Sequence, residues 1–420
     1  MKTEYSLKYG RETKSVYIDE GADVRVFRPH DLPAIAGLGK ELNRALDKPL
    51  DAVPLQKRPQ PSSVAIAVPD KSRPLPVNSL LPPLLERIRQ AWPDLSPSNI
   101  NVIVGGGLHP PLSEAELAET VSPAVKQKYP VTAHGADGDE FVSLGTTSLG
   151  TPVTINSRFW EADFKIVLGQ TDPHQFVGFT GGAKGAIIGC GARRTIEKNH
   201  CLMFRPGARV GRLSGNPVRE DINEAGKIAG IDFCVNAVMN ADNRPARLYA
   251  GAQDAVLEAS AVLCASVYGH EINELCDVAV VSCGGHPKDI CLYQAQKGLN
   301  LASMAVRPGG KILLLACCEE GVGDDSYYEY AGRFASAEDA MEDFKSGEFK
   351  MGAHKSYLFG LTLTRFEVVL CSDMPAETLA RCHIKKGDAQ QAVDTFINKQ
   401  PEGTKVAVVP AANTTYFYKK

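Results

Sequence analysis

The chain has 420 residues, of which 44% are hydrophobic and 23% are charged, and its formal net charge is -3. That length is enough for roughly two or three domains with separate hydrophobic cores, and the near-neutral charge argues against a protein that binds nucleic acid or a membrane surface, since both need a concentrated basic patch. The polar segment 1–21 lacks the apolar core of a signal peptide, and no apolar run reaches the ~20 residues that cross a bilayer.

Short runs of β-branched residues alternate with helical patterns in the first part of the chain, which is typical of α/β domains with mainly parallel sheets. The apolar runs predict strands at residues 24–27, 64–68, 101–107 and 162–169. A helix is predicted from about Asp31, whose side chain would cap its first turn. A second helix is predicted from a single apolar face, formed by Leu80, Leu81, Leu84, Leu85 and Ile88.

The same alternation restarts near residue 270. It predicts strands at residues 276–285, 310–316, 366–372 and 405–410, and a helix from about Asp289. We therefore expect two α/β domains, an N-terminal one of residues 1–272 and a C-terminal one of residues 273–420.

The 11 cysteines show neither a CxxC pair nor the spacing of zinc ligands, and several lie in apolar strands. Buried cysteines of this kind behave as small hydrophobic residues. We expect free thiols and a cytoplasmic protein, because disulfides are rare in a reducing cytosol.

Polar residues follow four of the predicted strands. In parallel α/β sheets, functional groups gather at the carboxyl ends of the strands. Each group has a plainer explanation: a lone histidine after a strand is more often a structural residue, and glycine pairs often form tight turns. Their coincidence at four strand ends favours a catalytic site. In chain order the groups are Asp70 and Arg73; His109; His174 and Lys184; and His286, Lys288, Tyr293, Gln294 and Lys297.

The segment from His174 to His200 is the most informative. Lys184 stands among glycines, so its amine can approach a bound cofactor closely and form a covalent link. His200 is predicted on a helix that opens near Thr195, and a neutral imidazole there can bind a borderline metal such as nickel, copper or zinc.

These motifs resemble those of the nickel-pincer nucleotide-dependent lactate racemase family, which includes 2-hydroxy-acid racemases and epimerases. The resemblance rests on PDKSRPLP (69–76), GGGLHPPLSEAEL (105–117), DPHQFVGFTGGAKGAIIGCGARRTIEKNH (172–200) and GGHPKDICLYQAQKG (284–298). It implies two α/β domains with the active site in the cleft between them. It also implies a nickel-holding pyridinium-3-thioamide-5-thiocarboxylic acid mononucleotide as cofactor, and cofactor-biosynthesis proteins as maturation partners.

The resemblance also implies a role for each matching residue. Lys184 would carry the cofactor covalently, His200 would bind the nickel, and His109 and His174 would be the acid–base pair. Arg73, Gln294 and Lys297 would hold the substrate's carboxylate or hydroxyl group. The positions that would line the cofactor and substrate are Asp70, Gly181, Gly182 and Tyr293.

The chemistry gives these roles a reason. The C2 hydrogen of a 2-hydroxy acid is poorly acidic, so its removal as hydride, with the hydroxyl proton taken by a histidine, is easier than direct proton abstraction. The product is a 2-keto acid, to which the hydride can return on either face. Two histidines are needed because the two enantiomers place their hydroxyl groups on opposite sides, and an imidazole suits both taking and returning a proton near neutral pH.

One departure concerns the substrate. Lactate-specific members of that family place a tryptophan in the second domain, whereas this chain has only Trp92 and Trp160, both in the first. The corresponding segment, 349–360, contains His354, Lys355 and Tyr357. It is either a solvated helix or a source of extra positive charge, in which case Lys355 would bind the substrate. The second interpretation predicts a substrate larger or more polar than lactate, such as a malate-like, hydroxyglutarate-like or sugar acid.

Four other functions remain open. The first is lactate racemase proper. The second is a nicotinamide-dependent oxidoreductase, although no GxGxxG follows a strand. A zinc hydrolase would use His109, His174 and His200 as ligands. A non-catalytic binding protein would have no need of Lys184 between two histidines. We expect an isomerase that acts on a small 2-hydroxy acid and binds neither nucleic acid nor membrane.

Overall fold

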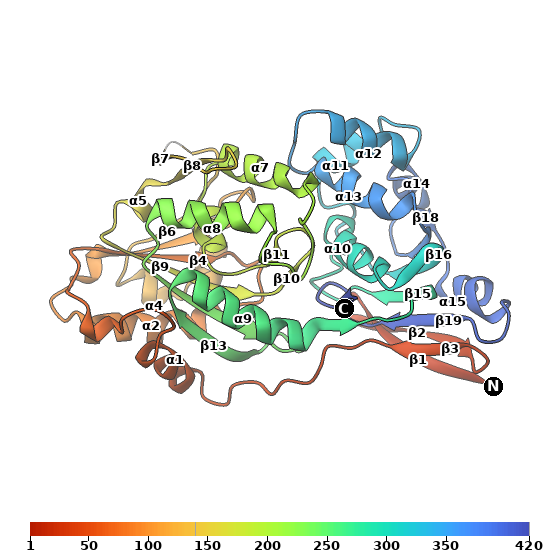
Figure 1. Ribbon diagram of the computed structural model, residues 1–420, viewed down its shortest axis with the longest axis horizontal. Coiled ribbons are helices and arrows are strands. Elements are labelled where there is room, and N and C mark those ends of the chain that lie inside the picture. Colours follow the sequence, from red (N-terminus) through yellow and green to blue (C-terminus); the bar gives the residue numbers. More distant parts are fainter. Residues whose placement is uncertain (139, 420) are drawn as a thin grey trace. The chain divides into compact units, whose positions relative to one another are not determined.

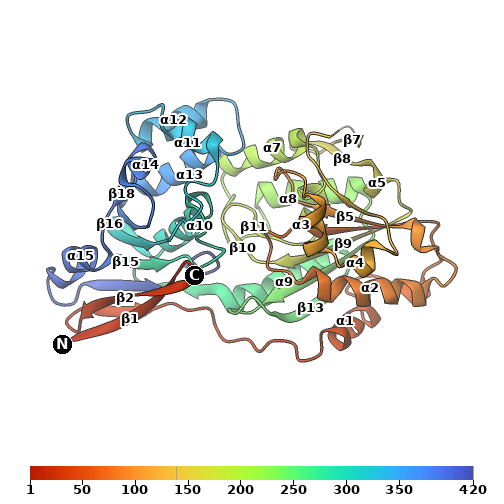
Figure 2. The same ribbon diagram turned by 180° about the vertical axis from the view of Figure 1, so that it is seen from behind.

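The computed structural model describes residues 1–138 and 140–419, and the chain forms two compact units (Figures 1 and 2). One unit spans residues 31–267, and the other joins residues 1–30 to the chain from residue 268 onward. The predicted α/β class with mainly parallel sheets is confirmed. The N-terminal segment differs from the expectation, because β3 (Asp23–Val26) adds to the edge of the C-terminal sheet, where Val24 pairs with Val406.

The unit of residues 31–267 is built on a six-stranded sheet of order β13-β12-β9-β4-β5-β6. Neighbouring strands are parallel except β12 and β13. In sheet order the strands are β13 (Pro245–Gly251), β12 (Phe233–Met239), β9 (Phe164–Thr171), β4 (Val64–Pro69), β5 (Ile100–Gly105) and β6 (Val131–Ala133). Two small antiparallel pairs accompany it, β7 (Phe141–Thr146) with β8 (Pro152–Asn156) and β10 (Pro173–His174) with β11 (Gly178–Phe179).

The helices of this unit are α1 (Leu38–Asp47), α2 (Val77–Ala91), α3 (Glu114–Thr120), α4 (Pro123–Lys126), α5 (Ser157–Trp160), α6 (Lys184–Ile187), α7 (Arg193–Cys201), α8 (Pro217–Ala229) and α9 (Gln253–Tyr268).

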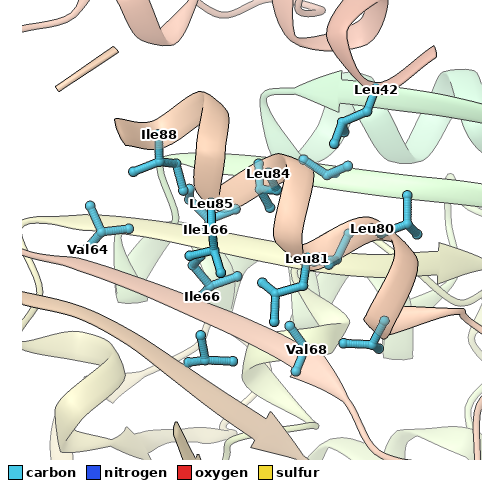
Figure 3. Packing of buried hydrophobic residues seen from close by; sticks show 14 of the residues in the cluster. Leu42, Val64, Ile66, Val68, Leu80, Leu81, Leu84, Leu85, Ile88 and Ile166 are labelled. Carbon is cyan, nitrogen blue, oxygen red and sulfur yellow. The ribbon is translucent and has the colours of Figure 1, made fainter. Parts of the chain in front are cut away.

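Strand alternation assigns helices to opposite faces of this sheet. Val64, Ile66 and Val68 pack against the predicted apolar face of α2 (Figure 3). Val167 of β9 pairs with Ala67, which lies between Ile66 and Val68. Successive strand residues point to opposite faces, so Val167 faces away from α2. A Cβ added to Gly185 in α6 would lie 2.6 Å from Val167 Cγ1, which places α6 on that second face. The predicted strands at 64–68, 101–107 and 162–169 are confirmed as β4, β5 and β9, and their carboxyl ends share one edge.

The helix predicted from Asp31 is wrong, because α1 begins only at Leu38. The preceding segment bonds instead to the β12–β13 connection: the Ile35 N–H donates to the Pro245 carbonyl at 2.8 Å, and the Asn240 amide donates to the Leu32 carbonyl at 3.1 Å. These tertiary hydrogen bonds satisfy backbone groups that a helix would otherwise pair internally.

The second unit has a six-stranded, fully parallel sheet of order β18-β17-β16-β15-β19-β3. Besides β3, its strands are β18 (Lys385–Lys386), β17 (Glu367–Cys371), β16 (Val306–Leu315), β15 (Cys276–Ser282) and β19 (Lys405–Val409). An N-terminal hairpin of β1 (Lys2–Tyr9) and β2 (Glu12–Asp19) and the pair β14 (Gly269–Glu271) and β20 (Tyr416–Tyr418) complete its strands. The helices are α10 (Leu292–Ser303), α11 (Asp325–Ala331), α12 (Ala337–Ser346), α13 (His354–Leu363), α14 (Ala376–Arg381) and α15 (Ala389–Val393).

Helices and the hairpin cover the two faces of this second sheet. Ala279 and Val281 belong to a core cluster with residues of α10, α11, α13 and α14. Val278 and Val280 belong to another, with residues of the hairpin and α15. The hairpin and α15 therefore share that face.

The structure corrects two further expectations for this unit. The helix predicted from Asp289 begins at Leu292, because the buried Asp289 carboxylate accepts the Gly10 N–H at 2.7 Å instead of capping a helix. The solvated interpretation of segment 349–360 is wrong, since His354 and Lys355 of α13 are 4% and 7% exposed. All eleven cysteines are free, as predicted. Within residues 1–138 and 140–419, no helix has the length and apolar character needed to span a membrane.

Candidate active site

A pocket opens at the shared carboxyl edge of β4, β5 and β9, within the unit of residues 31–267. The polar residues predicted from three separate strand ends lie together in its wall. The lining includes Asp70, Ser72, Arg73, Gly105, Gly106, Gly107, His109, Thr180, Gly181, Gly182, Lys184 and Gly189. The prediction that these strand ends converge is therefore correct for Asp70, Arg73, His109, Gly181, Gly182 and Lys184.

The first feature of this pocket is a carboxylate–imidazole pair. His109 Nδ1 lies 2.7 Å from Oδ2 of the buried Asp70. The Ser72 hydroxyl and N–H donate to the other carboxylate oxygen of Asp70, at 2.5 and 3.2 Å. Burial alone would raise the pKa of Asp70, but the hydrogen bonds from His109 and Ser72 and the charges of His109 and Arg73 outweigh it and lower that pKa. An ionised Asp70 requires the His109 proton on Nδ1, which leaves the Nε2 lone pair available.

The glycines after β5 allow this pair to form. A Cβ on Gly106 would lie 3.0 Å from Asp70 Oδ2 and 3.3 Å from His109 Cβ. A Cβ on Gly105 would lie 2.7 Å from the Gly189 backbone. Close approach of neighbouring chain, rather than a turn alone, therefore explains the glycine run.

Lys184 and His200 form a second feature, in which Lys184 lines the pocket but His200, like His174, is not among the lining residues. Lys184 opens α6 and lines the pocket, after Gly181 and Gly182, which both adopt positive φ angles of 97° and 58°. His200 is buried in α7. Burial, together with the positive charge of Lys184, lowers the pKa of His200 to about 3. Its ring is therefore neutral at pH 7, which is the form that binds a metal ion.

His174 adjoins this pair through Phe176. The His174 and Phe176 ring centroids are 4.6 Å apart, and those of Phe176 and His200 are 5.2 Å apart, both edge to face. The Val177 N–H donates to His174 Nδ1 at 3.4 Å, so the neutral ring carries its proton on Nε2. The two predicted acid–base histidines thus hold their protons on different ring nitrogens.

The remaining predicted residues lie in the other unit. Tyr293, Gln294 and Lys297 are on α10, and their assigned roles stay predictions. Lys355 Nζ donates to Gln296 Oε1 at 2.9 Å and lies 4.5 Å from the centroid of the Tyr293 ring. Burial is the main reason that its pKa falls to about 7.

Two other strand-end residues do not join a buried site. His286 Nε2 lies 3.0 Å from Arg11 Nη2 and 3.7 Å from Glu319, in a partly exposed cluster of charges. Lys288 follows it in the same turn, with the Asn413 amide donating to its carbonyl at 3.0 Å.

Sequence reasoning missed two residues that support the pocket. Ser72, which binds the Asp70 carboxylate, could have been found from its place in the turn after β4. Arg219 of α8, which binds carbonyl groups near Lys184, gave no signal, because a basic residue in a mixed helix is typical of a solvated face.

Comparison with known proteins identifies the family. A family model described as the lactate racemase N-terminal domain matches residues 9–211, and one described as the lactate racemase C-terminal domain matches residues 272–414. The chain belongs to the lactate racemase family. This confirms the predicted family and with it the enzyme class, an isomerase.

Relatives in the lactate racemase family match along most of their length. The chain is 27% identical to the lactate racemase of Lactiplantibacillus plantarum over 386 residues, 88% of each protein. It is 27% identical to the lactate racemase of Thermoanaerobacterium thermosaccharolyticum over 390 residues, 87% of this chain and 89% of that protein.

Solved structures support the same fold. The lactate racemase apoprotein of Thermoanaerobacterium thermosaccharolyticum superposes with a TM-score of 0.91, at 23% identity, over 99% of this chain and 100% of the other. A protein from Thermotoga maritima superposes with a TM-score of 0.68, at 14% identity, over 94% and 100%. Among the residues that the structure describes, no three His, Cys, Asp or Glu side chains are grouped to hold a metal ion, so the three-histidine zinc centre is not formed.

Proposed function

We propose that this chain racemises or epimerises a 2-hydroxy acid by hydride removal and return, through a 2-keto acid, with a nickel-pincer nucleotide attached to Lys184. The observation that carries the proposal is the convergence of two groups in one pocket. The Asp70–His109 pair supplies a base, and Lys184 supplies a primary amine beside it.

The donor set fits such a cofactor. Lys184 offers the amine for the covalent link from the pocket wall. His200 offers one neutral imidazole close to that lysine, which suits a metal whose other ligands belong to the cofactor. When bound, such a cofactor would supply a reversible acceptor for the C2 hydrogen as hydride.

The chain's own residues handle the substrate's proton and carboxylate. Arg73, in the wall of the same pocket, has the planar fork that binds a carboxylate in two places. His109 Nε2 takes the hydroxyl proton, and the Asp70 carboxylate stabilises the resulting imidazolium through Nδ1. His174 serves the opposite enantiomer. To take that enantiomer's hydroxyl proton at Nε2, His174 would carry its own proton on Nδ1, the tautomer that gives up the 3.4 Å bond from the Val177 N–H.

We further propose that the substrate is larger or more polar than lactate. Both tryptophans of the chain lie in the unit of residues 31–267. In the segment where lactate-specific relatives would carry one, Lys355 contacts Tyr293 and Gln296. These residues flank Gln294 and Lys297, the predicted substrate ligands, so Lys355 adds positive charge beside that helix when it is protonated.

The test begins with protein that carries mature cofactor. Intact mass and peptide mapping should place an adduct on Lys184. Racemisation in D2O should then leave C2 free of solvent deuterium, because hydride removed from the substrate returns to it. Deuterium at C2 would indicate proton abstraction and would contradict the mechanism.

Substrate preference is a separate measurement. Comparing kcat/KM for lactate, malate, gluconate and phenyllactate should favour malate or gluconate by about tenfold or more, which corresponds to ~1.4 kcal/mol. A clear preference for lactate or phenyllactate, unchanged in Lys355→Ala, would refute the polar-substrate proposal and leave the racemase proposal standing.

A further inference from the structure

Arg219 is a buried charge whose role the mechanism above does not use. It lies on α8 and is 1% exposed. Its guanidinium donates to the Phe179 carbonyl, to the Gly181 carbonyl at 3.3 Å and to the Asn223 side-chain oxygen at 3.4 Å. All three acceptors are neutral oxygens.

The charge of Arg219 has little compensation. The negative charge of Asp254 favours the protonated form of Arg219. The Asp254 carboxylate, however, pairs with Lys227 at 2.8 Å. Burial lowers the pKa of Arg219 to about 9, so the side chain is still charged at pH 7. A buried cation without a paired carboxylate is costly, and an apolar side chain would fill the same space without that cost. The hydrogen bonds of Arg219 must therefore serve a purpose beyond packing.

Those hydrogen bonds hold the loop that precedes Lys184. Gly181 and Gly182 have positive φ angles, and glycine has no conformational preference that would fix such a loop by itself. Asn236 holds the same loop from β12: its side-chain carbonyl accepts the Gly182 N–H at 3.0 Å in the orientation that satisfies both of its polar groups. Arg219 restrains the preceding carbonyls from α8.

We propose that Arg219 is a positioning residue for cofactor attachment, because it fixes the chain from Phe179 to Gly181 so that Lys184 presents its amine in the pocket. The proposal rests on the proposed covalent link at Lys184, in which the amine would form a thioamide C–N bond with a thiocarboxylic acid group of the cofactor and release water. An arginine is needed because its rigid, planar fork donates to two separated carbonyls at once, whereas a lysine ammonium is a point charge on a flexible stem.

The test measures the attachment step and not turnover. Cofactor-free wild type, Arg219→Lys and Arg219→Ala are mixed with purified cofactor, and the rate of adduct formation on Lys184 is followed by intact mass and peptide mapping. Both variants should attach the cofactor at least about tenfold more slowly, since misplacing a reacting group by about 1 Å has effects of this size or larger. Low millimolar guanidinium should restore part of the rate in Arg219→Ala but leave wild type unchanged.

A second readout follows the loop directly. Amide hydrogen exchange at residues 180–184 should be faster in both variants before any cofactor is added. The matched control is Leu84→Ala in α2, which creates a cavity on the other face of the same sheet and lowers stability without touching the loop. It should change neither the attachment rate nor the loop exchange.

The outcomes separate the two proposals. No adduct on wild-type Lys184 would overturn the proposed function, and the role of Arg219 with it. An adduct that forms as fast in Arg219→Lys and Arg219→Ala as in wild type would overturn only the role of Arg219. Equal slowing in Leu84→Ala would do the same, because it would trace the effect to general stability.

Discussion

Replacing Asp70 by asparagine tests the base assigned to His109 with the least change in shape. In Asp70→Asn the side-chain oxygen would still accept the Ser72 hydroxyl, which now donates to Asp70 Oδ1 at 2.5 Å. The new amide group would then face His109 Nδ1, where the carboxylate oxygen lies at 2.7 Å. An amide N–H donates to an unprotonated nitrogen, so the ring proton would move to Nε2 and the lone pair that takes the substrate's proton would be lost.

The expected loss can be bounded from this geometry. A hydrogen bond to a charged group contributes ~1.5–3 kcal/mol, and ~1.36 kcal/mol is a factor of ten in rate. Losing the carboxylate's support therefore lowers kcat by about 10-fold to 150-fold. The wrong ring tautomer adds to this, as in the serine-protease triad, where the same exchange costs ~10⁴. We expect kcat for Asp70→Asn to fall by about 10²-fold to 10⁴-fold.

The assay compares initial rates for both enantiomers at equal cofactor loading, with the adduct on Lys184 measured by intact mass. Ser72→Ala is the matched control, because it removes a hydrogen bond to Asp70 but keeps the carboxylate that sets the His109 tautomer, and its loss in kcat should be smaller than that of Asp70→Asn. A fully loaded Asp70→Asn enzyme within about threefold of wild-type kcat would refute the tautomer argument.

The same variant has a pH-dependent stability. Hydrogen bonds and nearby positive charge outweigh burial and hold the folded pKa of Asp70 below its ordinary value of 3.8. The carboxylate therefore stabilises the fold fully above pH 3.8, and this contribution is lost as pH falls through the lower folded value. The stability difference between wild type and Asp70→Asn, measured by urea unfolding, should shrink in that acid range. A difference that grows there would contradict the shift.

Three further predictions concern other residues. Lys184→Ala should abolish the covalent adduct while leaving the thermal midpoint nearly unchanged, because the side chain lines a pocket; an active, adduct-free variant would exclude the tether. His200→Ala should hold nickel weakly or lose it, and full nickel occupancy by elemental analysis would make His200 a purely structural residue. Lys355→Met should be more stable than wild type at pH 7. The lysine titrates near 10.5 when unfolded and near 7 when folded, so the unfolded state binds more protons between these values and wild-type stability rises with pH. The advantage of methionine should therefore shrink toward pH 10, and a pH-independent difference in urea unfolding would contradict it.

Local patterns predicted the pocket because its residues stand directly after apolar strands. The polar turn from Asp70 to Arg73, the glycines before His109 and the segment around Lys184 each adjoin a strand that its own composition reveals. The parallel arrangement then brings the three strand ends to one edge. The rule that functional groups gather at the carboxyl ends of parallel strands needs no knowledge of tertiary contacts.

What the sequence did not reveal depends on partners far along the chain. The apolar pattern of residues 24–27 predicts a strand, but it does not predict that β19 is the neighbouring strand. The expected helix at Asp31 is displaced by hydrogen bonds to the β12–β13 connection. Arg219 and Lys355 are buried with hydrogen-bond acceptors from other elements, the Gly181 carbonyl and the Gln296 side chain. The sequence of the helix that carries each residue does not reveal such acceptors.

The return of the N-terminal segment to the C-terminal sheet sets an order of events during synthesis. Within residues 1–138 and 140–419, β3 pairs only with β19, so it waits for residues 405–409, on the order of tens of seconds at ~5–20 residues per second. Residues 31–267 emerge without interruption, so their sheet and the segment that carries Lys184 and His200 can fold earlier. Until β15 (Cys276–Ser282) and β16 (Val306–Leu315) emerge, the hairpin's apolar Leu7, Val16 and Ile18 have no sheet to cover. The nascent chain therefore offers chaperones an exposed, strand-forming hairpin that leaves the ribosome well before the sheet it covers.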